Sequence, residues 1–406
     1  MNTKTRRARE CCSNLLQRKQ AGAINSSAKH HPQSFQQIAA LQSRLHHRHT
    51  HLQLLTMARR LLLLLAGTAN ALQRPAAPRR TLVTRQAHEP KQYQIIAGPA
   101  CEAMAQRIQA SEPARFTYHE TSWDKFPDGT DRIVVGGFQP KNEIAGEHVL
   151  MLASFHDNDV TLSQFQVMVM LLMSFVESLT IVLPFYPTGT MERVVTEGEV
   201  ATAATYAHLF SSLPSCGRPT RLIVYDLHTL QNRFYLHGNT VASLHTTVPC
   251  LIPRLEAAGI DAVAFPDDGA AKRFKHMFDS AVYEIIVCGK VRDGDNRVVT
   301  VQDGDVNDKK VVIVDDLVQT GGTLYECGAK LLDLGAASVS AFVAHGVFPR
   351  EAWKRFARGG DRDVFDTFYV TNSIPTTTDK LPSDDVFEVI DLTERVIEDL
   401  DNYSSM

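Results

Sequence analysis

The first 90 residues have almost no acidic side chains: only Glu10 and Glu89 stand against 15 lysines and arginines. A basic segment that is also rich in Arg, Ser, Gln and His is typical of transit peptides. Within it, residues 57–71 run from MARR through a short apolar stretch to ANA, which is the order of a secretory signal. We expect residues 1–90 to be a disordered targeting leader. A start at Met57 favours a plastid bounded by extra membranes. The alternatives are a mitochondrion, or the cytoplasm if the leader is not part of the expressed protein.

Long apolar runs are also missing. A transmembrane helix needs about 20 consecutive apolar residues. The best stretch, residues 165–176, is interrupted by Gln166 and Ser174 and is followed by Glu177. The seven cysteines are odd in number and have neither zinc-ligand nor disulfide-framework spacing. We therefore expect no association with a membrane, and thiols that pack in the interior rather than a redox or metal centre.

The rest of the chain has an excess of negative charge. Residues 91–406 hold 27 of the 42 basic side chains and 43 of the 45 acidic ones. This excess argues against a broad basic face for nucleic acid, so no nucleic-acid partner is expected. An acidic surface suits metal ions instead, and metal ions bring phosphorylated small molecules with them.

Short β-branched runs alternate with helical stretches from residue 91 onward. Strand followed by helix, repeated, predicts a parallel sheet covered by helices on both faces. About ten such runs are more than one sheet of this kind usually holds, so we expect two α/β domains, residues 91–240 and 241–406. Ligands should then bind just beyond the carboxyl ends of the strands. The expected elements include strands at 283–288 and 311–314 and helices at 162–178 and 350–357.

Residues 311–323 (VVIVDDLVQTGGT) have the composition of a phosphate-binding loop. Four apolar residues predict a buried strand, Asp315 and Asp316 follow at its carboxyl end, and a helix begins near Leu324. Glycines let backbone N–H groups approach an anion, and a helix N-terminus favours negative charge. The spacing and the absence of lysine exclude a P-loop. An ordinary helix cap needs one Asp, whereas two adjacent carboxylates can accept hydrogen bonds from vicinal hydroxyls. The segment therefore predicts binding of ribose 5-phosphate.

The loop resembles the signature of the phosphoribosyltransferase superfamily. Other segments resemble ribose-phosphate pyrophosphokinases, the enzymes that make phosphoribosyl pyrophosphate (PRPP): FPDG at 126–129, residues 226–235 beginning DLH, PDDG at 266–269, GKVR at 289–292 and HGVF at 345–348. The resemblance covers residues 93–387. It implies two tandem phosphoribosyltransferase-like domains in a homo-oligomer. It also implies a Mg²⁺-dependent transfer of the diphosphoryl group of ATP to the anomeric hydroxyl of ribose 5-phosphate, giving PRPP and AMP.

The resemblance also implies roles for individual residues. Catalysis is expected from Lys290 and Arg292. Ribose 5-phosphate is expected to bind at Asp315, Asp316, Gln319, Thr320, Gly321, Gly322 and Thr323. The nucleotide is expected at Asp128, Gly129, Arg193 and His228, and the metal at Asp226, His228 and Asp267.

The chain departs from the commoner class of this family at residues 186–193 (YPTGTMER), where many members have Arg-Gln-Asp. Together with GKVR, this version resembles the plant-type, phosphate-independent class, so phosphate activation and ADP inhibition are not expected. Asn232, Arg233 and His237 alter the metal signature, and residues 372–373 (NS) replace Asp-Thr. Two alternatives stay open: a transferase that consumes PRPP, and a catalytically silent regulatory paralogue.

Overall fold

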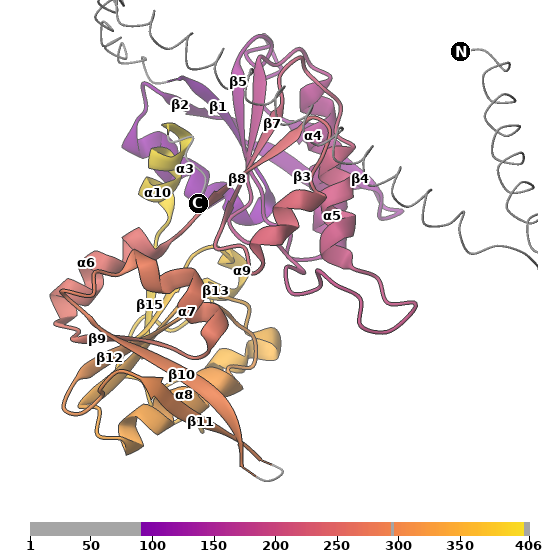
Figure 1. The fold of residues 1–406 in the computed structure, drawn as a ribbon. Helices are drawn as coiled ribbons and strands as arrows, with labels where there is room; N and C mark the ends of the chain where they lie inside the picture. The colour runs from indigo at the N-terminus through magenta and orange to yellow at the C-terminus, as the bar shows by residue number, and fades with distance from the viewer. Residues whose placement is uncertain (1–90, 294–295, 402–406) are drawn as a thin grey trace, which may run out of the picture. The chain divides into compact units, whose positions relative to one another are not determined.

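The computed structural model contains two mainly parallel sheets, the first within residues 93–245 and the second within residues 262–390 (Figure 1). It describes residues 91–293 and 296–401, so the predicted leader at 1–90 lies outside the described residues. Both sheets belong to the unit formed by residues 89–406. The predicted architecture, α/β with two mainly parallel sheets flanked by helices, is confirmed.

The first sheet has six parallel strands, in the order β2-β1-β5-β6-β7-β8. Its strands are β1 (Tyr93–Ala97), β2 (Phe116–Tyr118), β5 (His148–Leu152), β6 (Ser178–Val182), β7 (Thr220–Tyr225) and β8 (Thr240–His245). One face packs on α4 (Asn158–Leu172) and α5 (Thr202–Ser211), and the other on α3 (Glu102–Ser111). Strands β3 (Thr121–Lys125) and β4 (Asp131–Val135) form a separate antiparallel hairpin.

The second sheet has seven strands, in the order β11-β10-β9-β12-β13-β14-β15. They are β9 (Ala262–Phe265), β10 (Glu284–Asp293), β11 (Asn296–Asp303), β12 (Lys310–Val318), β13 (Ser338–Gly346), β14 (Phe368–Thr371) and β15 (Phe387–Ile390). Only β11 runs antiparallel to its neighbour, β10. Helices α6 (Val248–Ala258) and α7 (Asp268–Phe274) cover one face, and α8 (Gly322–Asp333) covers the other.

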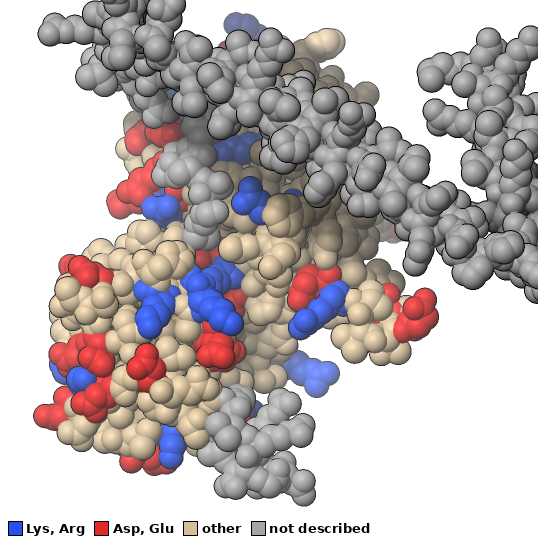
Figure 2. Space-filling model, in the orientation of Figure 1, with Lys and Arg blue, Asp and Glu red and all other residues tan. Residues whose placement is uncertain are grey.

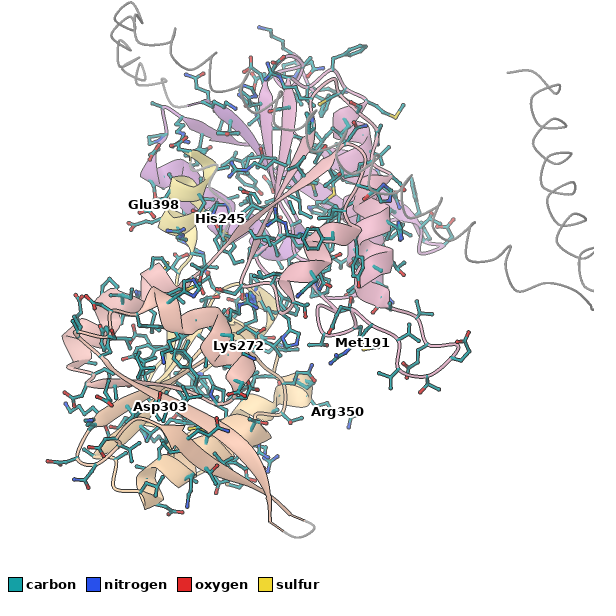
Figure 3. The ribbon with its side chains drawn as sticks, in the orientation of Figure 1. Met191, His245, Lys272, Asp303, Arg350 and Glu398 are labelled. Atoms are coloured by element: carbon teal, nitrogen blue, oxygen red, sulfur yellow. The ribbon has the colours of Figure 1, made fainter. Side chains whose placement is uncertain are left out.

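The last helix, α10 (Thr393–Asp401), returns to the first sheet and packs beside α3 (Figure 1). Asp399, wholly buried, lies 2.9 Å (Oδ1–Nδ1) from His245 at the end of β8, which Figure 3 labels. Arg221 of β7 donates to the backbone oxygens of Asp399 and Leu400. The first sheet therefore runs on to His245 and is covered partly by the C-terminus, so the first sheet with its helices is not one continuous stretch of chain.

Several predicted elements differ in length or type. The helix predicted at 162–178 begins earlier, because Asp157 caps α4 by accepting from the backbone N–H of Val160, and it ends at Leu172. Residues 350–357 hold a 3-10 helix, η4 (Pro349–Arg355), in which two residues have left-handed backbone angles. The strands predicted at 283–288 and 311–314 are longer, because β10 pairs onward with β11 and β12 with β13.

Charges on the described surface are mixed. Figure 2 shows acidic and basic side chains interspersed on the face drawn, without a continuous basic area among the residues coloured there. None of the helices in the described ranges combines the length and apolar character needed to span a bilayer.

Candidate active site

The two predicted acidic residues of the ribose-phosphate loop lie inside β12 rather than after it. The ladder between β12 and β13 continues through Asp315, opposite Val343, to Val318. The backbone N–H of Asp316 donates to Oδ1 of Asp315 (2.9 Å). Burial, together with the neighbouring charge of Asp316, raises the pKa of Asp315 well above its usual value. Burial and the neighbouring carboxylate thus both disfavour ionisation of Asp315.

The loop after β12 turns at Gly321, which has a φ of +68° and caps α8. A Cβ built on Gly321 would lie 2.3 Å from Cζ of Phe356, so both the backbone angle and the space require glycine here. Gln319 and Thr320 are exposed beside it, and Gly322 and Thr323 form the first turn of α8, close to the start predicted near Leu324. An exposed turn at a helix N-terminus is a suitable place for a phosphate.

Arg362 adds a positive charge to this loop, which sequence reasoning missed. Its Nη1 donates to the backbone oxygen of Thr320, and its guanidinium lies 5.6 Å from the ring centroid of Tyr325 in α8. Arg362 is 42 residues away from Thr320 in the chain, in a polar loop. No local motif marks it, so only the folded chain reveals it.

Asp226 lies at the carboxyl end of β7, wholly buried and with a φ of +39°. Its Oδ2 accepts from the backbone N–H and the hydroxyl of Thr247, at 2.8 and 2.6 Å. Its Oδ1 is buried and makes no hydrogen bond. One oxygen of Asp226 therefore orders the turn before α6, while the other makes no hydrogen bond and lies 3.8 Å from Nη2 of Arg273.

His228 connects this region to the ribose-phosphate loop. Its Nδ1 lies 2.7 Å from Oδ2 of Asp316. The hydrogen bond to Asp316 outweighs partial burial and raises the pKa of His228. Burial alone would raise the pKa of Asp316, but the hydrogen bond and charge of His228, with the charge of Arg273, bring it below its usual value. A hydrogen-bonded histidine-aspartate pair thus joins the ends of β7 and β12.

Arg273, on α7, is a second cation that sequence reasoning missed. Its Nη1 lies 3.4 Å from Oδ2 of Asp316 and its Nη2 lies 3.8 Å from Oδ1 of Asp226. Nη1 also donates to the backbone oxygen of Leu227. The side chain is only 10% exposed, so this charge neutralises two carboxylates from two different sheets. In the sequence it looks like an ordinary basic residue near the end of an amphipathic helix.

A cavity of about 350 Å³ lies beside this network. It is lined by Asp226, His228 and Gln319 of the predicted site, by residues 185–191 of the loop after β6, and by Leu227, Leu317, His345 and Val347. Met191, labelled in Figure 3, belongs to that lining loop. The volume lies at the low end of what small-molecule sites usually have. Residues predicted for nucleotide and for ribose 5-phosphate thus share one cavity.

Comparisons with known proteins agree with this geometry. The phosphoribosyl transferase domain family matches residues 257–372. Ribose-phosphate pyrophosphokinase 4 from Oryza sativa subsp. japonica is 40% identical over 328 residues, which are 79% of this chain and 98% of the rice protein. The chain belongs to the ribose-phosphate pyrophosphokinase family.

Other relatives of this family carry organelle names. Ribose-phosphate pyrophosphokinase 3, chloroplastic, from Arabidopsis thaliana is 42% identical and covers 71% of each chain. The mitochondrial protein from Spinacia oleracea is also 42% identical, covering 72% of this chain and 73% of its own. Among solved structures, phosphoribosylpyrophosphate synthetase from Mycobacterium smegmatis has the same fold, with a TM-score of 0.61 and 23% identity over 76% of this chain and 98% of that one.

Not all residues predicted from the pyrophosphokinase resemblance line the cavity. Asp128 and Gly129 lie at the exposed turn of the β3–β4 hairpin, where Asp128 accepts from Thr130. Arg193 is 81% exposed and pairs with Glu192. Asp267 caps α7 by accepting from the backbone N–H of Ala270. Each of these residues thus has an ordinary structural explanation.

Lys290 and Arg292 lie on β10, where the backbone pairs them with Val299 and Arg297 of β11. They were predicted to follow the strand, but the hairpin extends β10 to Asp293. Within the described residues, no three His, Cys, Asp or Glu side chains gather closely enough to form a metal cage. A Mg²⁺ held by one or two carboxylates, water and substrate oxygens needs no such cage.

Proposed function

We propose that this chain transfers the diphosphoryl group of ATP to the anomeric hydroxyl of ribose 5-phosphate, giving PRPP and AMP. One observation carries the proposal: the loop at 315–323 and the residues Asp226 and His228 meet through the His228–Asp316 contact of 2.7 Å. A phosphoribosyltransferase needs only the loop. A second nucleotide-facing region, joined to that loop, suits an enzyme that brings ATP and ribose 5-phosphate together.

Ribose 5-phosphate binds with its phosphate at residues 319–323. The helix N-terminus, the threonine hydroxyls and Arg362 offer donors and positive charge to the phosphate. Asp315 and Asp316 accept hydrogen bonds from the ribose hydroxyls. The pKa of Asp315 is raised and the pKa of Asp316 is lowered, so the two carboxyls differ in how readily they ionise. The anomeric carbon then points toward the shared cavity.

Catalysis rests on positive charge at the transferred group. As the anomeric oxygen attacks the β-phosphorus and AMP leaves in line, negative charge collects on the phosphoryl oxygens. Lys290 and Arg292, on the β10–β11 hairpin, stabilise that charge. Most such catalysis comes from positioning and electrostatics, so loss of one cation should lower turnover more than substrate binding.

Mg²⁺ is the proposed cofactor, and the donor set fits it. Oδ1 of Asp226 is buried without a hydrogen bond, with Nη2 of Arg273 at 3.8 Å, and such an oxygen suits a cation. Asp226, His228 and Asp267 would hold the ion directly or through water. When bound, it neutralises charge on the diphosphate of ATP. His228, Asp128, Gly129 and Arg193 are the proposed nucleotide contacts.

We also propose the organisation and location of the protein. Residues 91–240 and 241–406 form two domains. Strand β8 and helix α10 come from the second stretch of chain but complete the first domain. The chain acts as a homo-oligomer, and its basic leader directs it to a plastid, as the name of the Arabidopsis relative suggests. Fluorescence microscopy of the tagged full chain tests the location, and mitochondrial or cytoplasmic signal would contradict it.

The test is AMP release by the purified full chain with ATP, Mg²⁺ and ribose 5-phosphate. Lys290→Ala should abolish turnover while leaving the affinity for ribose 5-phosphate largely intact; Lys272→Ala, an exposed lysine on α7, serves as the control. If no AMP is released above background, with or without added phosphate, the proposal fails and the alternative of a catalytically silent regulatory paralogue remains. Consumption of PRPP with a nitrogen base would favour the transferase.

A further inference from the structure

Two cysteines face each other between β10, which carries Lys290, and α8, which follows the phosphate loop. Cys288 lies on β10 and Cys327 lies on α8, and their Sγ atoms are 3.4 Å apart. Both side chains have no exposed surface. Both are thiols, as are the other cysteines in the described ranges. The sequence suggested only packing roles, because 39 residues separate the pair.

The surroundings of the two thiols are apolar. Cys288 and Cys327 belong to the core cluster formed by Val299, Ile313, Leu324 and other residues on the α8 side of the second sheet. A bulge between Val287 and Cys288 shifts the register of β10 against β11 just before the pair. The hydrogen bond from Cys327 lowers the pKa of Cys288, whereas burial raises the pKa of Cys101 to about 12. The thiol of Cys288 is thus chemically unlike the buried thiol of Cys101.

We propose that Cys288 and Cys327 form a reversible disulfide that switches off diphosphoryl transfer under oxidising conditions. The sulfur atoms need to approach from 3.4 Å to the bonded distance of about 2.05 Å. Side-chain rotation and a small movement of the hairpin accomplish this, because each cysteine starts in contact with the other. The oxidant is a peroxide, since a small molecule reaches a buried thiol more readily than another protein's disulfide does.

The chemistry balances with one molecule of hydrogen peroxide. The thiolate of Cys288 attacks one peroxide oxygen, and the O–O bond breaks to release hydroxide, which becomes water after protonation. This leaves a sulfenic acid on Cys288. The sulfur of Cys327, on losing its proton, attacks the Cys288 sulfur and displaces a second hydroxide, which also becomes water. Two thiols are oxidised to one disulfide, and the peroxide is reduced to two waters.

The effect on activity rests on the proposed function. Lys290 lies two residues beyond Cys288 on β10, and the first turn of α8, which contains Thr323, precedes Cys327 by one turn. A covalent bond between them ties the hairpin that bears the catalytic cations to the helix that ends the phosphate loop. Displacement of catalytic groups by about 1 Å can cost about a hundredfold in rate. We expect the oxidised chain to turn over at least about tenfold more slowly.

The test compares four full-length chains: wild type, Cys288→Ala, Cys327→Ala and Cys101→Ala. Each is exposed to hydrogen peroxide while folded, then denatured, alkylated and digested for peptide mapping. AMP release is measured before oxidation, after it, and after dithiothreitol. We expect a peptide linked through Cys288 and Cys327 in wild type and in Cys101→Ala. Their activity should fall and then return, while Cys288→Ala and Cys327→Ala should keep theirs.

Three results would overturn the inference. One is separate alkylation of both cysteines after oxidation of the folded wild type. Another is conversion of Cys288 to sulfinic acid while Cys327 remains a thiol. The third is an activity that does not follow the disulfide, seen as unchanged AMP release by the linked chain or as an equal loss in Cys327→Ala. If the reduced wild type releases no AMP, the proposed function fails, and the peptide map still decides whether the disulfide forms. Should an alanine variant not fold, Cys327→Ser replaces it.

Discussion

Nδ1 of His228, just beyond β7 of the first sheet, lies 2.7 Å from Oδ2 of Asp316 in β12 of the second. The pKa of the imidazole is raised and the pKa of the carboxyl is lowered. Burial acts against both shifts, but the hydrogen bond between the two groups and the nearby charges outweigh it. The pair therefore links the nucleotide side and the ribose-phosphate side of the proposed site. Arg273 approaches the same oxygen of Asp316 from α7.

The first prediction concerns this link. His228→Ala or Asp316→Asn should lower kcat/KM for PRPP synthesis by about 10- to 100-fold, as loss of groups that orient a metal or substrate site usually does. Steady-state AMP release gives the value. His276→Ala, at an exposed histidine just after α7, should behave like wild type. Normal kinetics for both His228→Ala and Asp316→Asn would show that the link has no part in catalysis.

The second prediction concerns Arg273. Replacing it by Met leaves the buried carboxylates of Asp226 and Asp316 without their shared cation. Removing one partner of a buried ionic network costs about 3 to 5 kcal/mol in free energy of unfolding. Urea denaturation measures it. Its exposed neighbour Lys272, labelled in Figure 3, is the control, and Lys272→Met should stay within about 0.5 kcal/mol of wild type. Equal stabilities of the two variants would contradict the bridging role.

The third prediction separates backbone strain from crowding in the phosphate loop. Gly321→Ala forces a side chain onto a left-handed backbone and against Phe356. Gly359→Ala meets the same backbone penalty, at a φ of +79°, with no atom within 4 Å of the new Cβ. Both should lose about 1 to 2 kcal/mol of stability from the backbone alone. Calorimetric titration should show weakened ribose 5-phosphate binding only in Gly321→Ala; equal binding by both would contradict the assignment of the loop.

The fourth prediction is a pH dependence of stability at Asp391, which precedes α10. Burial would raise the pKa of Asp391, but hydrogen bonds from Thr393 and Asn372 and the charge of Arg107 lower it. A depressed folded pKa stabilises the fold above the unfolded value of about 3.9 and loses that effect as pH falls through the folded value. The melting temperature of wild type should exceed that of Asp391→Asn at neutral pH, and the gap should shrink below pH ~4. Asp379→Asn, at an exposed site, is the control, and its melting temperature should follow that of wild type at every pH. A difference between wild type and Asp391→Asn that widens in acid would contradict the prediction.

The parts of the site that the sequence predicted are those whose residues are neighbours in the chain. Two carboxylates, two glycines and a following helix sit within residues 311–333, so local chemistry was enough to predict a phosphate loop. The alternation of strands and helices likewise predicted two parallel sheets, because burial on both faces leaves continuous apolar strands. Boundaries were less well predicted, since β12 carries its two acids inside the ladder with β13.

What the sequence did not predict depends on distant contacts. Arg273 and Arg362 look like surface residues until the fold brings them to Asp316 and Thr320. Strand β8 was not predicted, because its sequence contains several polar residues and lacks a clear strand pattern. Its pairing with β7 stabilises it as a strand. The closeness of Cys288 and Cys327 likewise follows from packing of α8 on the second sheet and not from their spacing.

The most direct test of the central claim identifies both products of the purified full chain with ATP, Mg²⁺ and ribose 5-phosphate. Phosphorus NMR or mass spectrometry should detect AMP and PRPP in equal amounts, with the diphosphate of PRPP derived from the β- and γ-phosphorus of labelled ATP. Formation of ADP with a singly phosphorylated sugar, or ATP hydrolysis without PRPP, would contradict the account.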